Sequence, residues 1–227
     1  GHYSRLQLSR AWRIENPKLW KSYASERDRV SAELRSVRGP TPKLDVRAEL
    51  GRCTGGLPGE RLQGAVSETF LLHGTKPATL ISILSEGLNE RFSSGLFGSG
   101  TYLAEDAGKV DQYVEMDDAF DPRGRVEQDV VSLHARLYRD DRGHPGRVYY
   151  VLLCRVVMGH FVRTPEGPTR PPNAVYANDR ELARIPGETV RYHGLVAELG
   201  HRIQRYREFV QFDSKRIYPE YLVAYHR

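Results

Sequence analysis

The stretch Phe70-Leu71-Leu72-His73-Gly74-Thr75 marks the point at which the pattern of the chain changes. A short apolar run that stops at a glycine is typical of a strand buried on both faces of a sheet. Pro77 then opens a helix that ends at Gly87, since proline suits a first helical turn and glycine a helix end. The sequence therefore predicts a buried strand followed directly by a helix.

More strand-like segments follow toward the C-terminus. Residues 148–158 predict a strong central strand, and residues 192–197, 205–212 and 217–225 predict three further strands. The intervening segments 115–146 and 163–188 are polar or rich in proline, which predicts loops. The pattern favours an α+β fold with a large share of strand.

Working back toward the N-terminus, residues 3–14 predict a strand with Leu6, Leu8, Trp12 and Ile14 on one face. The pair Asn16-Pro17 is a helix start, with an N-cap side chain before a proline, and the helix is expected to reach about residue 38. Residues 39–66 predict a long connection. We therefore expect a strand-helix extension with its linker over residues 1–65 and a core over residues 66–227.

Length, charge and cysteine content restrict the function classes. The 227 residues hold 34 Lys and Arg against 29 Asp and Glu, a net charge of +5. Residues 1–52 contribute 12 basic and 6 acidic side chains, which leaves 22 − 23 = −1 for the rest. This distribution weakens a nucleic-acid-binding interpretation. No membrane span or signal peptide is apparent, so an intracellular location, cytoplasmic or nuclear, is expected.

Glu208 breaks the pattern of its own strand. In residues 206–212, alternation places Tyr206, Glu208, Val210 and Phe212 on one face. Burying a carboxylate among apolar side chains costs several kcal/mol unless it is paired. Two interpretations stay open from this pattern: an edge strand with Glu208 in solvent, or a functional carboxylate at the floor of a cleft.

Other polar residues have ordinary explanations when each is taken alone. His73 fits a core histidine and Tyr102 a core aromatic residue. His134 and His144 lie among acidic residues, but their spacing matches no metal motif, which favours a solvated loop. Cys154 alternates within a strand and is expected to be a buried structural thiol.

Several catalytic signatures are missing. The glycines of residues 95–100 match neither a Walker A loop nor a dinucleotide-binding turn. The sequence contains no Gly-x-Ser-x-Gly elbow. Its two cysteines are too few for a disulfide framework or a four-cysteine zinc site.

Taken together, the motifs resemble the catalytic domain of the poly(ADP-ribose) polymerase (PARP) family, the diphtheria-toxin-like ADP-ribosyltransferases. The matching pieces occur in the family's order over almost the whole chain: Arg13-Ile14-Glu15-Asn16-Pro17, Leu72-His73-Gly74-Thr75, Gly87-Leu88-Asn89-Glu90-Arg91, Phe97-Gly98-Ser99-Gly100-Thr101-Tyr102, Leu153-Cys154-Arg155-Val156, Tyr206-Arg207-Glu208-Phe209 and Tyr218-Pro219-Glu220-Tyr221. The resemblance implies two packed, mainly antiparallel β-sheets with short helices.

The resemblance also implies a site. The family's His-Tyr-Glu catalytic triad maps onto His73, Tyr102 and Glu208. NAD⁺, consumed as a substrate, would be contacted by His73, Gly74, Thr75, Asn89, Arg91, Tyr102, Lys109 and Tyr113. In such a site Glu208 would stabilise the positive charge that develops as the glycosidic bond to nicotinamide breaks.

Two departures from the family pattern matter. Val110 stands where a serine hydroxyl usually bonds the nicotinamide carboxamide, and loss of that bond is worth about 0.5–1.5 kcal/mol. Tankyrases carry a cysteine-rich zinc element in the region equivalent to 115–147, whereas this chain has no cysteine there. We therefore expect no metal.

The function implied is NAD⁺-dependent transfer of ADP-ribose to macromolecular acceptors, protein side chains above all and the enzyme itself among them, with release of nicotinamide. Chain elongation to poly(ADP-ribose) is chemically possible because the glutamate is retained. The alternatives are an ADP-ribosylating toxin or effector, a nucleic-acid modifier, or a domain that binds NAD⁺ or ADP-ribose without turnover.

Overall fold

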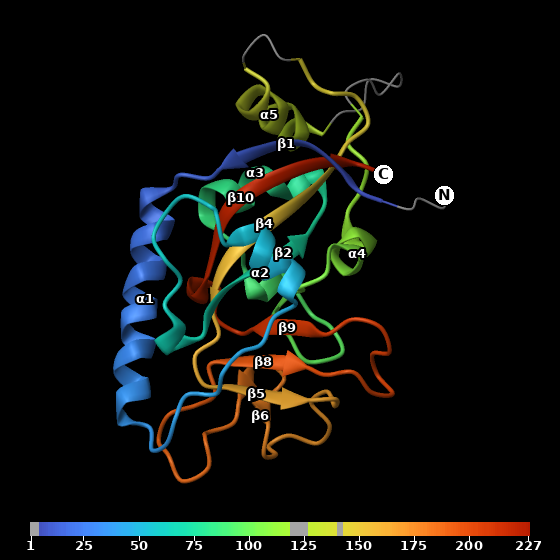
Figure 1. The fold of residues 1–227 in the computed structure, drawn as a ribbon. Coiled ribbons are helices and arrows are strands. Elements are labelled where there is room, and N and C mark those ends of the chain that lie inside the picture. The colour runs from blue at the N-terminus through green and yellow to red at the C-terminus, as the bar shows by residue number, and fades with distance from the viewer. Residues whose placement is uncertain (1–4, 119–126, 140–142) are drawn as a thin grey trace.

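The computed structural model describes residues 5–118, 127–139 and 143–227, and its strands form two four-stranded sheets and a small hairpin (Figure 1). The first sheet is antiparallel, with the order β1 (Gln7–Arg13), β10 (Ile217–His226), β4 (Tyr149–Val157) and β2 (Glu68–Gly74). The second has the order β3 (Thr101–Leu103), β9 (Glu208–Gln211), β8 (Gly194–Ala197) and β5 (Phe161–Thr164). Only the β5–β8 pair of these sheets is parallel. The predicted α+β fold with two mainly antiparallel sheets is confirmed.

The helices are short except the first. They are α1 (Pro17–Ser36), α2 (Ala48–Thr54), α3 (Pro77–Glu86), α4 (Ala107–Val110) and α5 (Gln128–Leu137). α1 begins as predicted, because the Asn16 side chain accepts a hydrogen bond from the Leu19 N–H and Pro17 takes the first helical position. None of the helices within the described ranges combines the length and apolarity that a membrane crossing needs.

The main core lies between the two sheets and the helices that cover them. Its largest cluster joins Phe70, Leu152 and Leu222 of the first sheet to Phe209 of the second, with α3 and α5 packed on it. β4 is buried along almost its whole length, which explains its continuous apolar sequence. This packing holds the ends of β2, β3 and β9 in fixed positions.

Several local predictions were wrong. Leu8 is 65% exposed, because a bulge between Leu8 and Arg10 shifts the register of β1 against β10. The connection 39–66 contains α2, and the proline-rich segment 163–188 contains the hairpin of β6 (Tyr176–Asn178) and β7 (Glu181–Leu182).

The segment 115–146 was predicted to be a solvated loop, and this was wrong for the two histidines in it. His134 lies on α5, and its side chain is only 22% exposed. The His144 side chain is 9% exposed, and both imidazoles contact the carboxylate of Asp117. The sequence also predicts turns at Asp121-Pro122 and at residues 143–146; the first lies outside the described residues, and the second is described, with bends at Gly146 and Arg147.

A buried charge cluster joins three strands of the first sheet. Arg155 of β4 is 2% exposed, and its Nε donates to Oε2 of Glu220 on β10 at 2.7 Å. Its Nη1 lies 3.4 Å from Oε1 of Glu68 on β2, which also accepts the Tyr23 hydroxyl at 2.6 Å. Arg155 Nη2 donates to the carbonyl of Glu60 at 2.7 Å. The guanidinium thus compensates two buried carboxylates and ties α1 and the 39–66 connection to the sheet.

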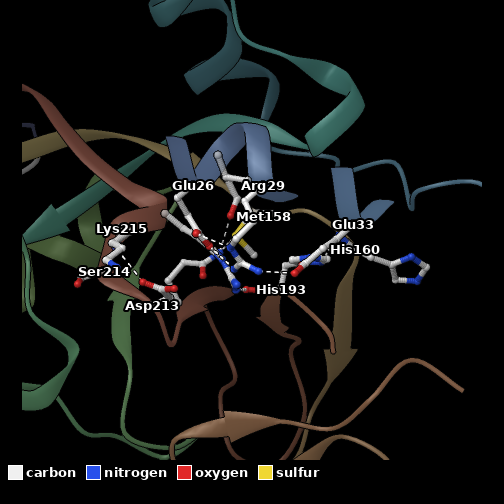
Figure 2. Close-up of polar contacts among 12 residues, drawn as sticks. Glu26, Arg29, Glu33, Met158, His160, His193, Asp213, Ser214 and Lys215 are labelled. Atoms are coloured by element: carbon white, nitrogen blue, oxygen red, sulfur yellow. Dashed lines mark hydrogen bonds and ion pairs between the residues drawn. The ribbon is translucent and has the colours of Figure 1, made fainter. Parts of the chain in front are cut away.

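A second polar cluster fixes α1 to the segments beside β8 and β10 (Figure 2). Glu26 of α1 accepts hydrogen bonds from Arg29 and from Nε of Arg216, the latter at 2.9 Å. His193, which is 1% exposed, lies with Nε2 3.0 Å from Oε2 of Glu33, and its Nδ1 accepts the N–H of His160 at 3.2 Å. Burial, together with the charge of Arg216, lowers the pKa of His193 to about 4.

Acidification from pH 6.5 toward pH 4 is expected to lower the free energy of unfolding. The His193 imidazole titrates near 6.5 when unfolded but near about 4 when folded, so the unfolded chain binds more protons between these values, a difference worth up to about 3 kcal/mol. Burial also lowers the pKa of His73 and His160, which adds to the same slope. Urea unfolding at a series of pH values measures this slope of the unfolding free energy against pH.

The variant H193Q should flatten that slope, because glutamine keeps a polar side chain but does not titrate. H201Q is the matched control, since the His201 side chain is 67% exposed and contacts Glu166 at the surface. An unchanged slope in H193Q would contradict the assignment of the pH dependence to His193.

Candidate active site

A cavity of about 530 Å³ lies where the ends of β2, β3 and β9 meet α4. A second cavity of about 760 Å³ adjoins it and extends along α3 toward residues 213–215. The two share His73, Gly74, Ser93 and Tyr113 as lining residues. The two neighbouring cavities therefore offer space for an elongated ligand with two ends.

His73 stands at the end of β2, paired with Leu152 of β4. Its Nδ1 lies 2.8 Å from the carbonyl oxygen of Tyr102. A carbonyl only accepts, so Nδ1 carries the proton and Nε2 keeps its lone pair as an acceptor. Removal from water lowers the pKa of His73, so the imidazole is neutral at pH 7 and suits a ligand hydroxyl.

Tyr102 on β3 organises the glycine-rich turn in front of it. Its hydroxyl donates to the carbonyl of Gly98 at 2.8 Å and accepts the N–H of Phe97 at 2.8 Å. Burial raises the pKa of Tyr102, which keeps the hydroxyl protonated. A Cβ at Gly95 would lie 2.6 Å from Cζ of the Tyr102 ring, so only glycine fits at that position. The ring thus forms a fixed wall of the cavity.

Glu208 is the first residue of β9 and is 6% exposed. β9 lies between β3 and β8, so the edge-strand interpretation with Glu208 in solvent is wrong. Its carboxylate forms a close ion pair with Nζ of Lys109 on α4. The carboxylate is therefore buried at the cavity floor and compensated by one lysine.

Lys109 also connects to Tyr113 one turn further on. Its Nζ donates to the Tyr113 hydroxyl at 2.9 Å and lies 5.0 Å from the centre of that ring. Burial alone would lower the pKa of Lys109, but the hydrogen bonds to Glu208 and Tyr113 outweigh it, and the pKa is raised. The Tyr113 ring is 57% exposed and forms the open side of the cavity, facing solvent.

Gly74 and Val110 form the back of the cavity. A Cβ at Gly74 would lie only 2.3 Å from the backbone oxygen of Val110, so β2 and α4 could not approach this closely with any other residue. Val110 is 5% exposed and presents no side-chain hydroxyl. The polar groups available here for a ligand amide belong to the backbone.

The other predicted ligand contacts line the larger cavity. Thr75 pairs with the Thr79 hydroxyl at 2.7 Å, and the Asn89 side chain accepts the Arg91 N–H at 3.0 Å. All the predicted site residues therefore lie around the two cavities: His73, Gly74, Thr75, Asn89, Arg91, Tyr102, Lys109, Tyr113 and Glu208.

The sequence did not point to several lining residues. Arg202 and Ile203 border the smaller cavity, and Asp213, Ser214 and Lys215 border the larger one. They come from loops before and after β9. No local spacing marks them, because only the fold brings these loops to the groove.

Comparison with known proteins identifies what the chain is similar to. The sequence model of the family "Poly(ADP-ribose) polymerase catalytic domain" matches residues 1–227. The chain is 25% identical over 226 residues to the protein mono-ADP-ribosyltransferase PARP11 of mouse and to that of human, covering 98% of this chain. It spans about half the length of these relatives, 53% of the mouse protein and 52% of the human one.

Proposed function

Because the chain belongs to the family of poly(ADP-ribose) polymerase catalytic domains, we propose that it transfers ADP-ribose from NAD⁺ to protein side chains and releases nicotinamide. The observation that carries the proposal is the convergence of His73, Tyr102 and Glu208 on one cavity. We propose that residues 1–65 and 66–227 act as one catalytic unit, since β1 is the edge strand of the first sheet.

The proposed position of NAD⁺ follows from the chemistry of the walls. Nicotinamide would lie in the smaller cavity between Tyr102 and Tyr113, whose aromatic faces suit a flat, cationic ring. The backbone of Gly74 would bond its carboxamide, and the Nε2 lone pair of His73 would accept a ribose hydroxyl. The larger cavity, with Thr75, Asn89 and Arg91 on its wall, would hold the adenosine half.

Glu208 is the proposed catalytic carboxylate. When the bond between nicotinamide and ribose breaks, the electron pair leaves with nicotinamide, which becomes neutral, and positive charge develops on the ribose ring. A fixed carboxylate in a buried site stabilises that charge more strongly than water does. The acceptor oxygen then bonds the anomeric carbon, and when the acceptor is a hydroxyl its proton passes to Glu208, which acts as the general base. Lys109 pairs with the carboxylate and orients it.

Val110 is expected to affect affinity more than turnover. A serine at this position would add one hydrogen bond to the carboxamide, worth about 0.5–1.5 kcal/mol. The backbone of Gly74 still offers its own groups at the same wall, because Gly74 permits the close approach of Val110.

We propose that the product is a single ADP-ribose unit. The two relatives named above are mono-ADP-ribosyltransferases by name. Because Glu208 is retained, chain elongation is chemically possible. The mass of the product distinguishes a single ADP-ribose unit from a chain.

The test is to incubate the chain with labelled NAD⁺ and separate protein, RNA and DNA acceptors, then to measure free nicotinamide and the intact mass of each product. We expect stoichiometric nicotinamide release and protein masses raised by single ADP-ribose units, the enzyme itself included. A ladder of units would instead mean chain elongation. Label confined to nucleic acid would contradict the protein acceptor, and binding of NAD⁺ without nicotinamide release would contradict catalysis altogether.

A further inference from the structure

Three potential metal ligands converge beyond the candidate active site. Asp117 lies shortly after Tyr113 in the chain, His134 lies on α5, and His144 lies in the segment before β4. One ligand atom from each lies within 4.8 Å of the others. The proposed NAD⁺ chemistry uses none of the three.

The geometry of this Asp117–His134–His144 cluster is close. Nε2 of His134 lies 2.8 Å, and Nε2 of His144 3.1 Å, from Oδ2 of Asp117. In a tetrahedral zinc site with bonds of about 2.0–2.1 Å, neighbouring ligand atoms are separated by about 3.3 Å. The two distances to Asp117 therefore need to open by only a few tenths of an ångström to accept an ion, while the two imidazole nitrogens lie within 4.8 Å of each other.

The carboxylate is held in place from several sides. The Asp117 side chain is only 2% exposed, and it accepts hydrogen bonds from His134, His144 and Tyr150. Its backbone is fixed by two hydrogen bonds to Val148, at 2.8 and 2.9 Å. A buried anion with two imidazoles directed at it is a preorganised donor set.

A second layer of residues orients the carboxylate. The Tyr150 hydroxyl donates to Oδ2 of Asp117 at 2.7 Å, and the Tyr138 hydroxyl lies 2.8 Å from that of Tyr150. The Tyr138 ring in turn packs edge-on against Trp12 of β1, 5.5 Å between centres. Such outer hydrogen bonds fix ligand orientation in metal sites.

We propose that Asp117, His134 and His144 bind one divalent transition-metal ion, Zn²⁺ above all. Two imidazole nitrogens and one carboxylate oxygen are a zinc donor set, with a remaining position for water or another ligand. The ion would join the segment after Tyr113, α5 and the turn before β4. Cysteine content and linear spacing predict no metal, because these ligands come from three separate segments that only the fold brings together.

Metal binding requires both imidazoles to give up the proton on Nε2, since each Nε2 lies within hydrogen-bond distance of the Asp117 carboxylate, and His144 must also rearrange locally. The N–H of Gly146 donates to Nδ1 of His144 at 3.2 Å, so the proton of this imidazole is on Nε2, directed at Asp117. Zinc takes the Nε2 lone pair, so that proton must leave Nε2. A neutral imidazole then carries its proton on Nδ1, and the long bond from Gly146 is released. Binding is therefore coupled to a shift of the turn at residues 143–146.

The experiment uses the whole 227-residue chain, stripped with a chelator and titrated with Zn²⁺ alone. We expect one equivalent per chain by elemental analysis, an upward shift of the melting temperature, and visible absorption bands of tetrahedral Co²⁺ when cobalt replaces zinc. Y150F should weaken affinity about 10–100-fold, the range for a lost outer hydrogen bond, and H134A and H144A should weaken it more.

H201A is the matched control for adventitious binding to an exposed histidine. It should retain full zinc affinity. D117N, which preserves side-chain volume, serves if a histidine variant fails to fold. Absence of stoichiometric uptake by the unmodified chain would overturn the proposal, as would equal affinity in H134A and H144A. None of these readouts depends on ADP-ribose transfer.

Discussion

Replacing Glu208 with glutamine is expected to lower the rate of ADP-ribose transfer by about 10²–10³-fold, the cost of removing one preorganised electrostatic group from a transition state. Glutamine has nearly the same shape but no charge, so it cannot stabilise the positive charge on the ribose. The residue is buried at the cavity floor beside Lys109, where that charge acts with little screening. Nicotinamide release under single-turnover conditions measures the effect.

The expected pattern is a fall in kcat with a modest change in KM. E181Q is the matched control, because Glu181 pairs with Arg191 at the surface and is 47% exposed. It should keep the activity of the unmodified chain. Melting temperatures of both variants separate a folding defect from a catalytic one. Unchanged transfer by a folded E208Q protein would defeat the assignment of the catalytic carboxylate.

Replacing Arg155 with methionine is expected to cost about 3–5 kcal/mol of unfolding free energy, the usual penalty for removing one partner of a buried ion pair. Methionine fills similar volume but leaves Glu220 buried without its cation and Glu68 with Arg27 alone, 3.5 Å away. For a chain of this length, the loss corresponds to a fall of about 6–20 °C in melting temperature. Calorimetry or urea unfolding gives the value.

R180M provides the comparison, since Arg180 is 62% exposed and lies 4.0 Å from Asp179. A surface pair of this kind contributes at most about 1 kcal/mol. The double variant R155M/E220Q should recover part of the lost unfolding free energy, because it removes the buried carboxylate that R155M leaves unpaired. A loss below 1 kcal/mol in R155M would contradict this prediction, and would mean that Arg27 suffices for Glu68 and that Glu220 needs no buried cation.

The sequence predicted the parts of the fold that depend on local pattern. The continuous apolar run of β4 and the Asn16-Pro17 start of α1 each carry their own physical signal, and both were found as expected. α5 was missed because its polar and apolar residues alternate in a short segment flanked by acidic residues. Leu8 was placed on the wrong face because a bulge in β1 is set by pairing with β10, not by β1 alone.

The candidate site also contains some residues that carry a local sequence signal and others that do not. Glu208 could be singled out because a carboxylate interrupts an apolar face, and the fold buries it beside Lys109. The roles of His73, Tyr102 and Glu208 stay predictions until activity is measured. Arg202, Asp117 and the histidine pair gave no usable local signal, since their neighbours come from distant segments that only the folded chain assembles.

The position of β10 between β1 and β4 has a consequence for biosynthesis. β1 leaves the ribosome long before β10, its strand partner among the described residues, since Gln7 faces His226. Synthesis at about 5–20 residues per second leaves the N-terminal strand without that partner for tens of seconds. Through this interval the nascent chain carries an exposed strand edge, and the first sheet is completed only after β10 has emerged. Nascent chains would therefore gain most from a chaperone that covers β1 until β10 arrives.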